Sequence, residues 1–107
     1  MRENAVDNTR EYDAEEVLLE EWDNIKKTVQ REYLISDISY RAFIKRLEIY
    51  EIKDDIITIS VPSDNAPSIN YLSYKYYLPI KDVIFGVLHK EYEIEFVLEK
   101  DLPQSTL

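Results

Sequence analysis

Apolar positions recur with a helical period in the first third of the chain. Residues 1–12 are mostly polar and show no such period, which predicts a disordered arm. Asp13 and Glu16 then have the spacing of a capping box, in which side chains satisfy free N–H groups at a helix start. Four apolar side chains follow on one helical face: Leu18, Trp22, Ile25 and Val29. We therefore expect a helix over residues 14–32.

A second, shorter helix and a hairpin are predicted next. Ser36 or Asp37 can cap the helix. Its apolar stripe consists of Tyr40, Phe43, Ile44 and Leu47. The period then falls from about 3.6 to about 2, as in strands. The apolar positions of the two expected strands are Leu47, Ile49 and Ile52, then Ile57, Ile59 and Val61. A hairpin turn is expected at Lys53-Asp54-Asp55, and Pro62 ends the second strand.

The last part of the chain predicts a divided helix and a final strand. Residues 63–89 are helical in pattern, with Pro67 in the first turn. Pro79 is expected to kink or split this segment, because its nitrogen cannot donate to the helix. From residue 92 the chain alternates, with four side chains facing inward: Tyr92, Ile94, Phe96 and Leu98. Residues 101–107 are expected to form a frayed tail.

The order of these elements, α-α-β-β-α(-α)-β, predicts an α+β fold. Its helices should pack on one face of a three-stranded sheet. A chain of 107 residues fits one domain, which we place at residues 13–100. We expect a single packed core.

Composition excludes several kinds of site. The chain has no cysteine, so disulfides and thiolate metal sites are ruled out. Its one glycine, Gly86, excludes a glycine-rich phosphate loop. His89 is the only histidine and lies at an expected helix end, where it more often contacts the last carbonyls than performs catalysis. We expect no metal, no cofactor and no enzymatic activity, although a small enzyme built on paired carboxylates is left open.

Charge bears on the class of partner. The net charge of −9 argues against a nucleic-acid surface, which needs basic residues to neutralise phosphates. A local basic patch is left at Arg41, Lys45 and Arg46. No apolar run is long enough to cross a bilayer, and the first residues lack the apolar core of a signal peptide. Together with the lack of cysteine, these features predict a cytoplasmic protein without a membrane partner.

Aromatic residues are the remaining candidates for function. Nine residues are tyrosines, and four of them fall within residues 71–77. One narrow helical stripe cannot hold all four, so at least one ring should be exposed. Such rings favour a binding surface, whereas packing on the sheet edge is the structural alternative. Trp22 has two interpretations as well: a core anchor or, with Leu18 and Ile25, a contact with a second copy.

Five segments between residues 17 and 98 carry a family resemblance. They are Leu19–Trp22 with Ile25, Tyr40–Leu47, Asp55–Ser63, Lys75–Ile80 and Tyr92–Leu98. In this order they are similar to the N-terminal domain (domain I) of the bacterial replication initiator DnaA. That family has a tryptophan in the first segment and a Lys-Tyr-Leu-Pro sequence in the fourth. The resemblance covers most of the chain.

The resemblance implies a KH-like fold and a role in protein–protein contacts. Self-association, expected as a weak homodimer, would fall on Leu18, Trp22 and Ile25. A second surface would bind the replicative helicase, DnaA or a DnaA regulator. It would contain Ser39, Phe43, Ser63 and Asn65, to which the tyrosine argument adds Tyr71 and Tyr74. Phe43 stands where the family usually has tryptophan, and Arg46 where it has proline.

The sequence therefore predicts a protein–protein interaction domain of replication initiation, either excised from DnaA or a free-standing relative. The alternative is a KH-like module that binds single-stranded nucleic acid. Such modules clamp the backbone with a Gly-x-x-Gly loop, which a chain with one glycine lacks. We therefore expect weak nucleic-acid binding or none.

Overall fold

The computed structural model describes residues 2–103, with side chains described from Ala14 onward. Two helical segments, a hairpin, a second pair of helices and a final strand follow in the expected order, which confirms the α+β fold. The elements are α1 (Arg2–Glu32), α2 (Asp37–Ser39), the π-helical turn η1 (Tyr40–Ile44), β1 (Glu48–Lys53), β2 (Ile56–Val61), the 3-10 helix η2 (Ser63–Ser68), α3 (Ile69–Lys75), α4 (Tyr77–Leu88), β3 (Glu93–Leu98) and the 3-10 turn η3 (Glu99–Asp101).

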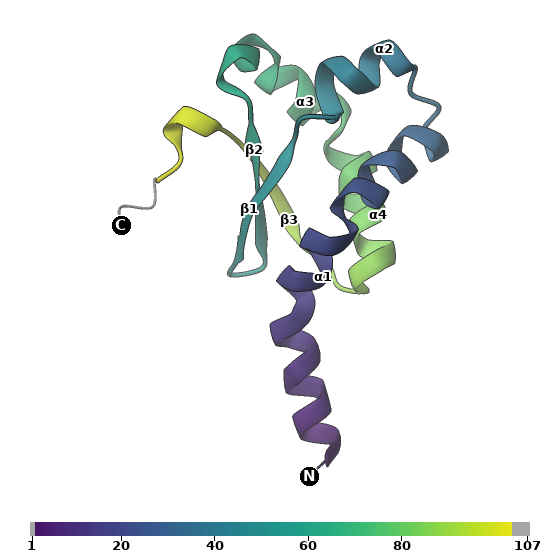
Figure 1. Cartoon of the computed structure of the whole chain (residues 1–107), viewed down its shortest axis with the longest axis vertical. Coiled ribbons are helices and arrows are strands. Elements are labelled where there is room, and N and C mark those ends of the chain that lie inside the picture. Colours follow the sequence, from purple (N-terminus) through teal and green to yellow (C-terminus); the bar gives the residue numbers. More distant parts are fainter. Residues whose placement is uncertain (1, 104–107) are drawn as a thin grey trace.

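The three strands form one mixed sheet with β2 in the centre (Figure 1). β1 pairs with β2 antiparallel through a turn in which Asp54 and Asp55 have φ of 56° and 63°, so the expected hairpin turn is confirmed. The register shifts between Ile49 and Glu51, which makes Tyr50 a bulge residue. β3 pairs with β2 in parallel, so helices α3 and α4 form the crossover between these two strands.

The core lies between the sheet and the helices. α1 and α4 pack against each other, and α1, α3 and α4 contact the strands (Figure 1). Ile57, Ile59 and Val61 of β2 have no exposed surface. Tyr92, directly before β3, and Ile94 of β3 are buried, while Phe96 and Leu98 are partly buried against the core, which confirms the predicted inward face. The covered face therefore carries the hydrophobic stabilisation of the fold.

The first helix starts earlier than expected. α1 starts at Arg2, so Asp13 lies inside it rather than at its N-cap. Residues 2–12 contain no glycine or proline that would end the helix. At the second helix Ser36 is the cap, since its hydroxyl accepts from the Ser39 N–H at 3.1 Å. The division into arm, domain and tail stays a prediction, and residues 104–107 of the tail lie outside the described residues.

The predicted split of the third helical segment occurs, but at Tyr76 and not at Pro79. Tyr76 has φ −110° and ψ 1° and separates α3 from α4. Pro79 instead occupies the first turn of α4, where its missing N–H needs no partner. A continuous helix would place the proline ring against the Lys75 carbonyl four residues earlier, so the helix breaks ahead of the proline.

Candidate functional site

The three side chains expected to mediate self-association are part of the core. Leu18, Trp22 and Ile25 are 0%, 3% and 1% exposed. The Trp22 indole N–H donates to the Leu47 carbonyl at 2.7 Å, so the polar atom of the ring is satisfied inside the protein. In this structure Trp22 is therefore a core anchor, the first of its two interpretations. A second copy has no access to these side chains while α1 is packed on the sheet, and self-association through them would first require α1 to leave it.

A buried lysine lies beside this tryptophan. Lys26 is 3% exposed, and its ammonium donates to the carbonyls of Lys45 at 2.6 Å and Leu47 at 3.1 Å. It also lies 5.6 Å from the centre of the Trp22 ring. These contacts satisfy carbonyls at the end of the second helical segment and fix that segment on α1.

An aromatic cluster joins η1 to α3. The Phe43 ring centre lies 4.8 Å from that of Tyr71 and 6.2 Å from that of Tyr76, and the two tyrosine rings meet edge to face at 6.0 Å. Tyr76 is buried, and this burial raises its pKa. Tyr71 is 39% exposed and Tyr74, next along the same helix, is 88% exposed. We call Ser39, Phe43, Tyr71, Tyr74 and Tyr76 the aromatic surface.

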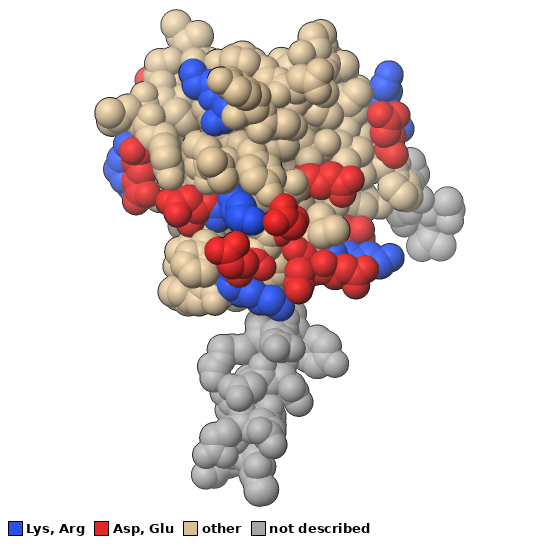
Figure 2. Space-filling view, turned by 180° about the vertical axis from the view of Figure 1, so that it is seen from behind, with Lys and Arg blue, Asp and Glu red and all other residues tan. Residues whose placement is uncertain are grey.

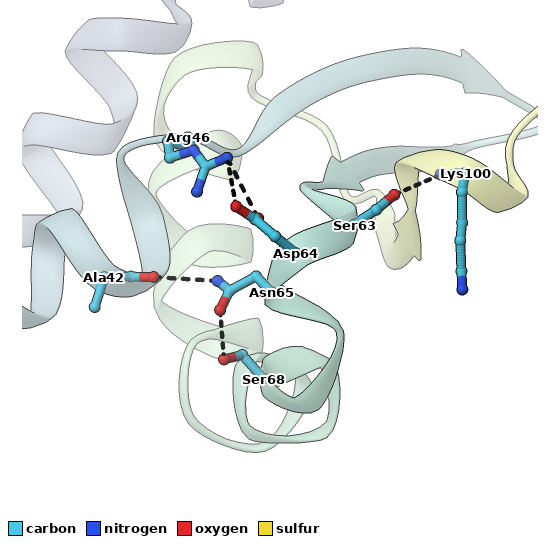
Figure 3. Close-up of polar contacts among 7 residues, drawn as sticks. All are labelled: Ala42, Arg46, Ser63, Asp64, Asn65, Ser68 and Lys100. Atoms are coloured by element: carbon cyan, nitrogen blue, oxygen red, sulfur yellow. Dashed lines mark hydrogen bonds and ion pairs between the residues drawn. The ribbon is translucent and has the colours of Figure 1, made fainter.

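Hydrogen bonds from η2 hold the two sides of this surface together (Figure 3). The Asn65 amide donates to the Ala42 carbonyl of η1 at 3.1 Å and accepts from the Ser68 hydroxyl at 2.9 Å. Asp64 forms an ion pair with Arg46 at 3.3 Å. These bonds keep the end of the second helical segment against the start of the third, so the aromatic rings are held in place before any partner binds.

The six residues predicted for partner binding therefore separate into groups. Phe43 and Tyr71 come together with Tyr76; burial raises the pKa of the Tyr76 hydroxyl, and Ser39 is close enough to lower it. Asn65 does not belong to the cluster but holds η2 against η1 through its bond to the Ala42 carbonyl. Ser63 points the other way and accepts the backbone N–H of Lys100 at 3.0 Å (Figure 3). The structure thus brings Ser63 to the C-terminal turn rather than to the aromatic surface.

Sequence reasoning missed Tyr76 as a part of this surface and Lys75 as a residue that contacts it. The ammonium of Lys75 lies 5.7 Å from the centre of the Tyr71 ring. Tyr76 turns inward because the helix breaks at this residue, and an unbroken helical wheel does not place it there. The available signal was Pro79, whose effect reaches back along the chain to that break.

Charge is distributed unevenly over the protein. The sheet face away from the helices carries Glu48 and Glu95, both exposed. Figure 2, seen from behind, shows charged side chains gathered across the lower half of the body and few in the upper part, toward α2 and α3. Of the basic patch expected on the second helix, Arg46 is paired with Asp64.

No catalytic arrangement is evident in residues 14–103. Among these residues no three His, Cys, Asp or Glu side chains converge as metal ligands. A hollow of about 650 Å³ contains the turn residues Asp54 and Asp55, but Asp55 is held by Lys90 at 3.1 Å. None of the described helices is both long enough and apolar enough to cross a bilayer.

The fold and this surface define a small α+β domain with an exposed aromatic site. No protein-family model matches the chain. Over 84 residues it is 32% identical to the chromosomal replication initiator protein DnaA of Lachnoclostridium phytofermentans. The matched segment covers 77% of this chain and 18% of that relative, so the chain spans less than a fifth of the relative's length. The chain is a distant homologue of DnaA, which confirms the resemblance and gives a replication-initiation context.

Proposed function

We propose that this chain is a cytoplasmic protein–protein interaction domain of replication initiation. It binds the replicative helicase, DnaA or a DnaA regulator through the aromatic surface. The observation that carries the proposal is Tyr74, which is 88% exposed on α3, three residues after the Tyr71 ring that packs on Phe43. A large exposed ring on the same surface as ordered aromatic rings favours a protein interface, where tyrosine contributes much of the contact energy.

The packing beneath the aromatic surface strengthens this proposal. Tyr76 is buried under the surface rings, and the amide of Asn65 ties η2 to η1. Because these groups are already ordered, a partner loses little free energy in arranging them. By contrast, no observation favours the alternative of a single-stranded nucleic-acid module. The open sheet face is acidic, and an acidic surface repels phosphates.

The test is a binding titration of the whole chain against purified replicative helicase, DnaA and DnaA regulators, all taken from the organism that encodes this chain. We expect at least one complex with a dissociation constant below about 50 µM. Tyr74→Ala should weaken that complex by roughly tenfold while leaving the fold intact, since the side chain has few internal contacts.

A matched control is Leu19→Ala, which removes an apolar side chain that is 53% exposed on α1. It should leave the affinity unchanged. Failure of all these partners to bind at about 50 µM would refute the proposal. Equal losses in the two variants would show that the aromatic surface is not the site.

A further inference from the structure

A second apolar face lies on the outer side of α4. Leu78 is 68% exposed and Phe85 is 45% exposed. They are seven residues apart, so they lie on the same side of the helix about 10 Å apart along its axis. Tyr33, at the end of α1, closes this face by donating its hydroxyl to the Asp82 carboxylate at 2.9 Å. The result is a groove of about 440 Å³ lined by Tyr33, Leu78, Lys81, Asp82, Phe85 and Glu91.

The residue that follows Tyr33 ends α1 in a left-handed conformation. Leu34 has a φ of 55°, and the Ile35 N–H donates to the Gln30 carbonyl at 2.9 Å. Many helices end in this way, although glycine or asparagine adopts the left-handed position more readily than leucine. The Leu34 side chain is 90% exposed and comes directly after Tyr33 of the groove in the chain.

The edge of the groove is acidic. Its one basic lining residue, Lys81, already forms ion pairs with Glu91 at 3.6 Å and with Glu93 at 3.3 Å. Asp82 contributes a further carboxylate. The pKa of Tyr33 is raised by its hydrogen bond to Asp82 and also by the nearby negative charge of Glu32. A complementary occupant would thus combine apolar anchors with positive charge.

We propose that this groove docks an amphipathic helical segment of a partner protein, with large apolar side chains about two turns apart and lysine or arginine beside them. This is a different surface from the aromatic one and does not depend on it. A second copy of this chain is a poorer occupant. A two-fold contact would set the carboxylates of Asp82 and Glu91 against their own counterparts.

Two labelled peptides test the proposal by fluorescence anisotropy with the whole chain. Both carry leucine and phenylalanine at the same helical positions, and one has lysine and arginine flanks while the other has glutamate flanks. We expect the basic peptide to bind with a dissociation constant of about 50 µM or lower, and the acidic peptide to bind roughly tenfold more weakly.

Variants of the groove separate specific docking from general attraction to an acidic protein. The double variant Leu78→Ser with Phe85→Ser keeps the net charge and should weaken the basic peptide roughly tenfold. Tyr74→Ala, on the aromatic surface, should not change peptide binding.

Several results would overturn the proposal. These are no binding of the basic peptide, equal binding to the wild type and the double variant, and equal binding of the two peptides. A concentration-dependent homodimer that the double variant abolishes would also overturn it, by showing that a second copy occupies the groove. None of these outcomes affects the test of the aromatic surface, whose readout depends on Tyr74.

Discussion

The two sets of side chains predicted for protein contacts lie in opposite environments. Leu18, Trp22 and Ile25 of α1 are buried in the core. Tyr74 of the aromatic surface is 88% exposed, on the same helix as Tyr71. The family resemblance assigns contacts to the first set and the run of tyrosines assigns them to Tyr74, but only Tyr74 is accessible to a partner in this fold.

The difference lies in whether the fold supplies a hydrogen-bond partner for the polar atom of each ring. The indole N–H of Trp22 has an internal acceptor in the Leu47 carbonyl, so burying the ring leaves no polar atom unpaired. No internal acceptor is evident for the Tyr74 hydroxyl in the described residues. A residue type that is common at interfaces therefore becomes a core residue where the fold supplies its hydrogen-bond partner.

The largest expected effect is that of Trp22→Ala. It removes a buried ring and the donor to the Leu47 carbonyl, so the free energy of unfolding should fall by about 3–5 kcal/mol. Urea unfolding followed by circular dichroism measures this loss. A change below about 1 kcal/mol, together with loss of a homodimer in sedimentation, would instead place Trp22 at a contact between copies.

Lys26→Met should have the next largest effect. Methionine keeps most of the volume but leaves the carbonyls of Lys45 and Leu47 without the ammonium donor, which should cost about 1–3 kcal/mol. Lys27→Met is the matched control, because Lys27 is exposed and should change stability by less than about 0.5 kcal/mol. If the two variants unfold at the same urea concentration, the buried lysine does not stabilise the fold.

Leu34→Gly should act in the opposite direction. Relief of the left-handed strain exceeds the flexibility that glycine adds to the unfolded chain, so stability should rise by about 0.5–1 kcal/mol. His89→Gly is a useful comparison, because His89 has a φ of 59° where α4 ends. A lower unfolding midpoint for Leu34→Gly would mean that the leucine packs against the protein after all.

The smallest effect concerns pH. The pKa of Glu93 is lowered by the hydrogen bond that Tyr77 donates and by the neighbouring Lys81. Because the folded pKa lies below its ordinary value near 4.5, the stabilisation is present above that pH and is lost as pH falls through the folded pKa. Tyr77→Phe should therefore make unfolding less sensitive to acid between pH 7 and pH 3. Identical pH dependence in both proteins would contradict this role of Tyr77.

Periodicity was enough to predict the order of the elements. The inward residues of β3 and the turn at Asp54 and Asp55 follow from alternation and turn chemistry, which are local properties of the chain. The break at Tyr76 was displaced from Pro79 because a proline disturbs the turn before it. The cause of the break is the proline, but the residue at which the break falls depends on where α3 ends.

The candidate sites were predicted less completely, because exposure depends on the whole fold. Lysine is usually a surface residue, and only the carbonyls brought together by packing explain the burial of Lys26. Likewise the sequence names Phe43 and Tyr71 but cannot show that their rings touch. The strain at Leu34 has no signature in residue type at all, since leucine is not expected in that conformation.

The parallel pairing of β2 with β3 has a consequence for how the protein is made. The hairpin of β1 and β2 closes over a short loop, whereas β3 joins β2 only after both crossover helices have been synthesised. Until Leu98 has left the ribosome, one edge of β2 has no neighbour and can pair with another chain. Nascent chains that stop short of residue 93 should therefore aggregate, because the final strand is what covers this edge of β2.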